Sequence, residues 1–218
     1  MDVLFLGKKN DPYVKKALDL CRQTASSVIS YLAEWDDPFP EDLQGWEGDY
    51  ILSDCARWVV PAWLLAKAKK AAINFHPATP DYPGIGCVNF ALYENAAQYG
   101  STCHHMLPKV DTGPIIDVER FFVYPTDTVA SVLDRTYQAQ LILFYRVWHK
   151  ILQGQELTPS SEERWGRTPL TRKQLTSLRA ITPEMSEEEI SRRLRATSFG
   201  AWKPFTEISG HKFEWVSS

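Results

Sequence analysis

The chain has 218 residues and lacks the sequence marks of several common protein classes. Its 4 cysteines are scattered without a CxxC pair, which indicates reduced thiols rather than a disulfide framework. The segment Gly7–Pro12, after the first apolar run, contains one glycine and cannot form a dinucleotide fingerprint. A P-loop signature is also absent, so an NAD-binding dehydrogenase is disfavoured.

An excess of positive charge and long apolar runs are lacking as well. The formal net charge is -3 at pH 7 and no dense stripe of lysine and arginine occurs, so binding to a nucleic-acid backbone has no electrostatic support. No run is long and apolar enough to span a bilayer. The first residues, MDVLFLGKKN, do not have the pattern of a signal peptide. We therefore expect a cytoplasmic protein with no nucleic-acid or membrane partner.

The first two thirds of the chain alternate between short apolar runs and helical patterns. Four runs predict strands: Val3–Leu6, Ser27–Leu32, Tyr50–Leu52 and Ala71–Phe75. Helical spacing follows the first run from Pro12 and the third run from Pro61 to about Lys69. This alternation predicts an α/β fold with a doubly wound, mostly parallel sheet.

A long helical pattern closes this region, and the composition then changes. Apolar positions recur at helical spacing from Thr128 to Leu152, with Asp127 as the expected N-cap and Gly154 as the expected stop. Short helical patterns follow, and residues 205–215 predict a hairpin about Ser209 and Gly210. We predict a catalytic domain over residues 1–153 and a small α+β C-terminal subdomain over residues 154–218.

Three polar side chains stand in two predicted loops of this sheet. Asn74 and His76 end the fourth apolar run, and Asp111 follows His76 by 35 residues (111 − 76). Ligands bind at the carboxyl ends of strands in such sheets. An amide, an imidazole and a carboxylate supply the oxyanion donor, the proton carrier and the orienting group that acyl transfer to an amine needs. For His76 alone, a buried structural histidine is the competing interpretation.

A metal site and a hydrolase nucleophile have weaker support. His104 and His105 are adjacent on a predicted strand and must point to opposite faces. The sequence has no HxxxH or HxH spacing and no GxSxG motif. We therefore expect no metal and a direct transfer reaction.

The motifs around these residues resemble the N10-formyltetrahydrofolate-dependent formyltransferases. The resemblance rests on Asn74–Pro77, Tyr82–Gly84 and Val110–Ile116. It implies a Rossmann-like catalytic domain, N10-formyltetrahydrofolate as the formyl donor, and Asn74, His76 and Asp111 as the catalytic residues. Asp111 would also contact the folate.

The resemblance also implies binding residues. Within Arg57–Pro61, which is similar to the loop that holds the pterin ring, Trp58 and Val60 would contact the folate. Tyr82 and Asn89 would touch the sugar of the acceptor, and Trp202 would stack on its base. Simple packing is the competing interpretation for Trp58, and loop rigidity for Tyr82 and Asn89.

The stretches FHPATPDYPGIGCVNFALYE and STCHHMLPKVDTGPI most resemble sugar N-formyltransferases. These enzymes formylate nucleotide-linked amino-deoxy sugars for surface polysaccharide synthesis, and the expected acceptor is dTDP-4-amino-4,6-dideoxyglucose. The resemblance also implies a homodimer. Methionyl-tRNA formyltransferases are longer and more basic. The alternatives are a glycinamide ribonucleotide formyltransferase, disfavoured by the missing phosphate loop, and a non-catalytic folate- or nucleotide-binding module.

The role of His76 stays open at this level. A neutral ring could accept the proton that the attacking amine loses, whereas a protonated ring could stabilise the oxyanion together with Asn74. One ring cannot do both at once.

Overall fold

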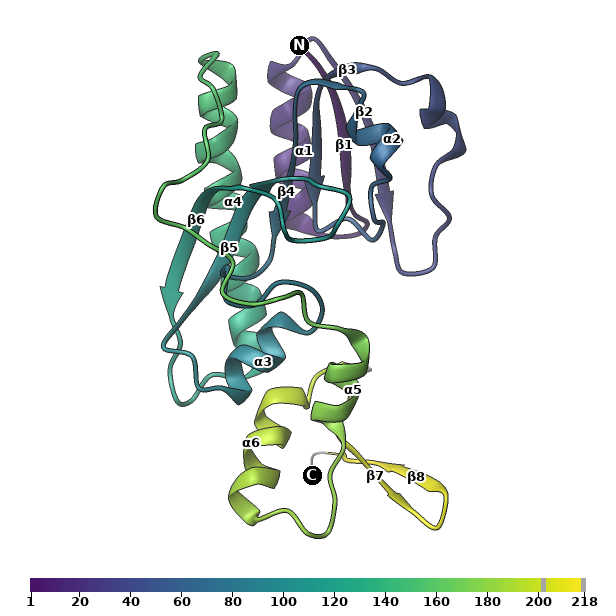
Figure 1. The fold of residues 1–218 in the computed structure, drawn as a ribbon, viewed down its shortest axis with the longest axis vertical. Helices are drawn as coiled ribbons and strands as arrows, with labels where there is room; N and C mark the ends of the chain where they lie inside the picture. Colours follow the sequence, from purple (N-terminus) through teal and green to yellow (C-terminus); the bar gives the residue numbers. More distant parts are fainter. Residues whose placement is uncertain (201–202, 217–218) are drawn as a thin grey trace.

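The structure is a computed structural model that describes residues 1–200 and 203–216 (Figure 1). Its main sheet has six strands in the order β2-β1-β3-β4-β5-β6. The strands are β1 (Asp2–Lys8), β2 (Ser27–Ala33), β3 (Gly48–Asp54), β4 (Ala68–His76), β5 (Gln98–His105) and β6 (Ile115–Phe122). The helices are α1 (Pro12–Thr24), α2 (Ala62–Leu65), α3 (Cys87–Tyr93), α4 (Val129–Leu152), α5 (Arg172–Arg179) and α6 (Glu187–Thr197).

The sheet is mostly parallel, as the alternation of strands and helices predicts. Strands β2, β1, β3 and β4 run parallel, whereas β5 and β6 are antiparallel to their neighbours. Strand β2 pairs with one side of β1, and the next strand in the chain, β3, pairs with the other side of β1. The carboxyl ends of β1 and β3 therefore form a topological switch point, where open α/β sheets bind ligands.

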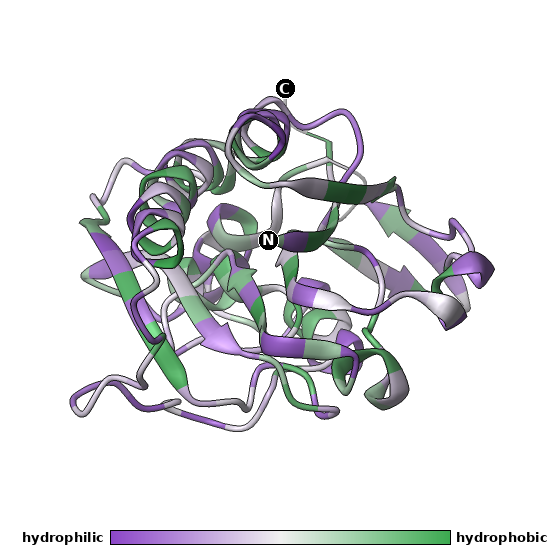
Figure 2. Cartoon of the chain, turned by 90° about the horizontal axis from the view of Figure 1, so that it is seen from above, coloured by the Kyte–Doolittle hydropathy of each residue, from purple (hydrophilic) through white to green (hydrophobic). Residues whose placement is uncertain are grey.

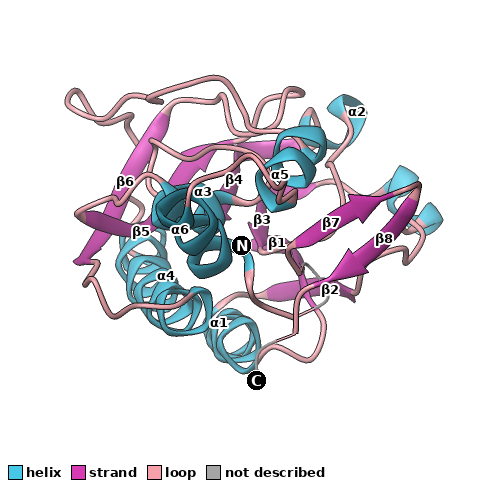
Figure 3. Cartoon of the chain, turned by 90° about the horizontal axis from the view of Figure 1, so that it is seen from below, coloured by secondary structure: helices cyan, strands magenta, loops and turns pink. Residues whose placement is uncertain are grey.

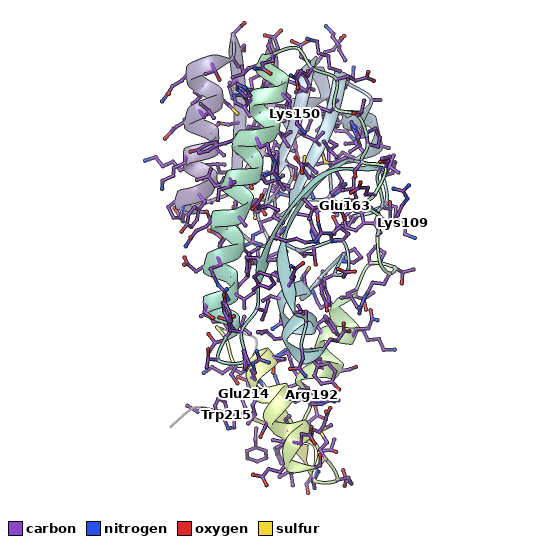
Figure 4. The ribbon with its side chains drawn as sticks, turned by 90° about the vertical axis from the view of Figure 1, so that its left-hand side faces the viewer. Lys109, Lys150, Glu163, Arg192, Glu214 and Trp215 are labelled. Atoms are coloured by element: carbon purple, nitrogen blue, oxygen red, sulfur yellow. The ribbon has the colours of Figure 1, made fainter. Side chains whose placement is uncertain are left out.

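Helices α1 and α4 lie side by side on one face of the sheet (Figure 3), and α4 runs along much of the molecule (Figure 4). In the view from above, helices carry both green and purple segments, because one face packs inward and the other meets solvent (Figure 2). Phe144 and Trp148 of α4 stack in the core between the helices and the sheet.

Two boundaries differ from the sequence-based expectation. The helix expected from Pro61 to about Lys69 is the single turn α2, and β4 already begins at Ala68, where it pairs with Gly48 of β3. The N-cap of α4 is Thr128 rather than Asp127, because the Thr128 hydroxyl accepts from the Ser131 N–H. Asp127 instead accepts the Tyr124 N–H and pairs with Arg135.

The C-terminal segment crosses back over the sheet before it forms its own elements. The Gly166 N–H donates to the Pro80 carbonyl, and the Leu170 N–H donates to the Pro83 carbonyl. Helix α6 packs against α3, and the expected hairpin is β7 (Phe205–Ile208) with β8 (His211–Glu214). Figure 4 labels Arg192 of α6 and Glu214 of β8 at this end of the molecule. Within the described residues, none of the helices has the length and apolar character needed to cross a membrane.

Candidate active site

Asn74 and His76 lie at the carboxyl end of strand β4. Side chains alternate along a strand, so Asn74 and His76 share one face while Phe75, which is buried, enters the core. The loop between β5 and β6 folds back over this face and places Asp111 beside both. Asp111 has a φ of 48°, a left-handed conformation that aspartate tolerates better than most residues. The structure thus brings together the three residues that the sequence singled out.

Asp111 lies between two imidazoles. Its Oδ2 is 3.3 Å from His76 Nδ1 and accepts the Gly84 N–H at 2.8 Å, while its Oδ1 is 3.3 Å from His104 Nε2. Burial alone would raise the pKa of Asp111, which is 5% exposed. The charge of His76 and the hydrogen bonds from His104 and Gly84 outweigh burial and lower the pKa to about 2. Asp111 is therefore ionised at neutral pH.

Both ring nitrogens of His76 face oxygen acceptors. Its Nε2 donates to the Tyr82 carbonyl at 3.0 Å, and its Nδ1 faces the Asp111 carboxylate. A doubly protonated ring would satisfy both acceptors, whereas either neutral tautomer would satisfy one. This geometry favours the role of His76 in charge stabilisation over its role as a base.

Asn74 lies beside a second histidine. Its Nδ2 lies 3.2 Å from His104 Nε2, and His104 Nδ1 donates to the His105 carbonyl at 2.8 Å. Because His104 Nε2 donates to Asp111, it cannot also accept from the amide, and both hydrogens of Asn74 Nδ2 stay available to an oxyanion. His105 points away and reaches the Leu157 carbonyl instead, as the alternation along a strand predicts.

Sequence reasoning missed His104, Trp165 and Gly84 as parts of this site. Trp165 donates from its indole to the Gly113 carbonyl at 2.8 Å, and its ring centroid lies 5.1 Å from that of His104 and 6.1 Å from that of His76. His104 had a signal, since it is one of two histidines on a strand beside the motif. Trp165 had none, because it comes from the segment that crosses back after α4.

The backbone conformation and close packing at position 84 require a glycine. Its φ is +94°, and a Cβ there would lie 2.3 Å from the Leu170 carbonyl oxygen. The missing side chain lets residue 170 approach and lets the Gly84 N–H reach Asp111.

The loop expected to hold the pterin has free backbone groups. Among the described residues, no backbone partner bonds the N–H or C=O groups of Trp58 and Val59. The Val59 side chain is 65% exposed, whereas Val60 is buried in the hydrophobic cluster with Leu64. Trp58 packs its ring against Phe39 and donates its indole N–H to the Asp37 carbonyl. These main-chain groups are available to a ligand, and the folate contacts of Trp58 and Val60 stay predictions.

The residues expected to contact the sugar have partners within the chain, and their sugar contacts stay predictions. Tyr82 reaches His76 through its carbonyl, while its ring packs against Tyr99 and under Arg167. The amide of Asn89 donates to the Ala196 carbonyl of α6 at 2.6 Å, so the structure uses it to join α3 and α6. Trp202 lies outside the described residues.

The amino end of α1 is closed to anions. The Asp11 carboxylate accepts the Tyr13 and Val14 N–H groups, and Pro12 has no N–H to offer. A phosphate therefore cannot dock there as it does on a glycine-rich loop. In the described part of the chain, no cluster of three or more histidine, cysteine, aspartate or glutamate residues could hold a metal ion.

Comparisons with known proteins identify the family and the fold. The family model described as formyl transferase matches residues 4–148. A GDP-perosamine N-formyltransferase from Brucella melitensis is 30% identical over 169 residues, which cover 77% of this chain and 64% of that protein. The chain thus spans somewhat less than two thirds of this relative.

Solved structures share the fold over nearly the whole chain. A sugar N-formyltransferase from a Shewanella species superposes with a TM-score of 0.76 at 17% identity, covering 100% of this chain and 97% of that one. An N-formyltransferase from Helicobacter canadensis, in complex with folinic acid and dTDP-3-aminofucose, has a TM-score of 0.70 at 17% identity and covers 95% and 84%.

Proposed function

The chain belongs to the formyl transferase family, and we propose that it transfers the formyl group of N10-formyltetrahydrofolate to the amino group of a nucleotide-linked amino sugar. The observation that carries the proposal is the convergence of Asn74, His76 and the ionised Asp111 at the end of β4. A protein that only binds folate or a nucleotide needs a pocket but has no need for this set. The names of the relatives support a sugar nucleotide as the acceptor.

The reaction needs little more than positioning and charge stabilisation. The unprotonated sugar amine attacks the formyl carbon, the bond from that carbon to N10 breaks, and the amine loses a proton while N10 gains one. The products are a formamide and tetrahydrofolate. The Asn74 amide and the His76 ring stabilise the negative charge that develops on the formyl oxygen, and Asp111 holds His76 in place.

The nucleotide and the position of the amine are finer proposals. We keep dTDP-4-amino-4,6-dideoxyglucose as the acceptor to test first, with GDP-perosamine beside it because of the Brucella relative. Formylation of either would serve surface polysaccharide synthesis. Glycinamide ribonucleotide is disfavoured because Asp11 closes the amino end of α1. The homodimer is a separate prediction, which the molar mass in solution tests.

A formylation assay against a panel tests the function. The panel contains N10-formyltetrahydrofolate with dTDP-linked 3-amino and 4-amino dideoxy sugars, GDP-perosamine and glycinamide ribonucleotide. Turnover of a sugar nucleotide supports the proposal and identifies the acceptor. Turnover of glycinamide ribonucleotide alone contradicts it, and folate binding without any turnover would favour the binding module.

His76→Ala tests the mechanism. We expect turnover to fall below detection while the affinity for folinic acid, measured by calorimetry, changes little, because the ring acts on the reacting group rather than on the pterin. His105→Ala, on the same part of the sheet but facing Leu157, is the matched control. A His76→Ala protein that keeps full activity would rule the mechanism out.

A further inference from the structure

Arg57, which follows β3, is an arginine without a polar partner. Among the residues that the structure describes, its guanidinium makes no hydrogen bond or ion pair, and its Nε is buried without an acceptor. Other arginines are engaged: Arg120 binds Glu163, Arg146 binds Asp117, and Arg193 binds Glu189. A buried cationic N–H without an acceptor is costly, and such a group indicates a partner that the chain itself does not provide.

An exposed tryptophan fixes the position of this guanidinium. The Cζ of Arg57 lies 4.3 Å from the ring centroid of Trp35, which is 52% exposed. Trp35 follows β2, so the loops after β2 and β3 meet here at the carboxyl edge of the sheet. The ring attracts the cation through its π electrons and leaves the N–H groups without acceptors. The pair is thus arranged to present a guanidinium to an anion.

Two more cations, Arg172 and Lys8, lie in this region. Arg172 at the start of α5 has its Cζ 5.9 Å from the Trp35 ring, and Figure 3 shows α5 in front of this edge of the sheet. On the other side, Arg57 acts electrostatically on Tyr137 of α4, whose ring lies 5.0 Å from Lys8 Nζ. Lys8, which also pairs with Asp11 at 3.0 Å, and Arg57 follow the neighbouring strands β1 and β3 at the switch point of the sheet.

We propose that Arg57, held by Trp35, binds an oxyanion of the acceptor, namely the diphosphate of the nucleotide sugar. The identity of the ligand rests on the proposed function. With the amino end of α1 closed by Asp11, side-chain cations have to replace the backbone groups of a phosphate loop. Arginine suits this task because its forked N–H groups match two phosphate oxygens. A diphosphate over β1 and β3 also leaves the neighbouring β4 free for the sugar amine.

The same guanidinium could bind a second oxyanion, the glutamyl carboxylate of the folate. The experiment therefore measures both ligands separately by calorimetry, without turnover. The probes are GDP, dTDP and pyrophosphate for the acceptor and folinic acid for the donor. The variants are Arg57→Gln, Arg57→Lys and Trp35→Leu, and Arg22→Gln is the control, because Arg22 on α1 bonds only the exposed Ser30.

We expect Arg57→Gln to weaken binding of the nucleoside diphosphate by about tenfold to a hundredfold, the usual effect of losing a charged hydrogen bond. Arg57→Lys should recover part of this loss and Trp35→Leu should show a smaller loss, with folinic acid binding unchanged in each. Unchanged nucleotide binding in Arg57→Gln overturns the inference. So does a loss confined to folinic acid, or a wild-type protein that binds none of the phosphate probes.

The outcome is separable from that of the proposed function. If nucleotide binding depends on Arg57 but the protein formylates no sugar, the proposed function is contradicted and the role of Arg57 in diphosphate binding is supported. If the Arg57→Gln variant formylates the sugar nucleotide with an unchanged KM, the proposed function is supported and the role of Arg57 in diphosphate binding is contradicted.

Discussion

Asp54 at the end of β3 and Asp111 in the loop between β5 and β6 are buried to a similar degree, with 3% and 5% exposure. Their pKa values move in opposite directions. Burial dominates at Asp54 and, with the nearby charge of Asp11, raises its pKa to about 7 although Gln140 donates to it. At Asp111 two imidazoles and a backbone N–H outweigh burial. The number and charge of the partners therefore decide which carboxylate is ionised in this protein.

Removing the charge of Asp111 should have the largest effect. Asp111→Asn keeps the size of the side chain but takes away the anion that holds His76 and faces His104. We expect kcat to fall by on the order of a hundredfold or more, measured as formamide production at saturating substrates. Asp117→Asn, which breaks the half-buried pair between Asp117 on β6 and Arg146 on α4, is the control and should keep kcat near the wild-type value. Equal losses in both variants would contradict a specific role for Asp111.

The two aspartates should also oppose each other in the pH dependence of stability. The low pKa of Asp111 stabilises the folded state above about pH 4, and this contribution is lost as the pH falls through about 2. The raised pKa of Asp54 acts the other way. The folded state retains a proton that the unfolded state releases, so stability declines as the pH rises from about 4 to about 7.

Asp54→Asn should remove that decline, which is about 1.4 kcal/mol per pH unit at most. Urea unfolding between pH 4 and pH 8 measures it. Gln140→Leu sharpens the test because it removes the donor that lowers the pKa of Asp54, and should extend the decline to higher pH. A wild-type protein and an Asp54→Asn variant with parallel pH profiles would show that Asp54 is ionised in the folded state.

The smallest effect concerns the segment that crosses back over the site. Trp165→Phe loses the hydrogen bond to Gly113 but keeps an aromatic ring beside the histidines. One neutral hydrogen bond contributes about 1 kcal/mol, so kcat/KM should fall about fivefold. Trp215→Phe, on the exposed segment after β8, is the control. A larger loss than that of Asp111→Asn would mean that Trp165 contacts the substrates directly.

Much of the fold was predictable because local patterns and global packing agree. The apolar runs of β1 and β3 are buried on both faces. Helix α1 buries the apolar residues that recur at helical spacing in its sequence. The helix expected after Pro61 failed because pairing with β3 competes with helical propensity in residues 68–70. The reversed direction of β5, which makes its pairings with β4 and β6 antiparallel, was not predictable, because the side-chain period of a strand does not encode its direction.

The sequence by itself determined the chemistry of the site. It placed an amide, an imidazole and a carboxylate in motifs near strand ends, and these types suit the proposed transfer with charge stabilisation. Only the tertiary structure decided their environment. The partners His104, Gly84 and Trp165, the closure of α1 by Asp11 and the unpaired Arg57 depend on contacts between segments far apart in the chain. Ionisation and hydrogen-bond balance depend on distance and burial, which sequence spacing does not fix.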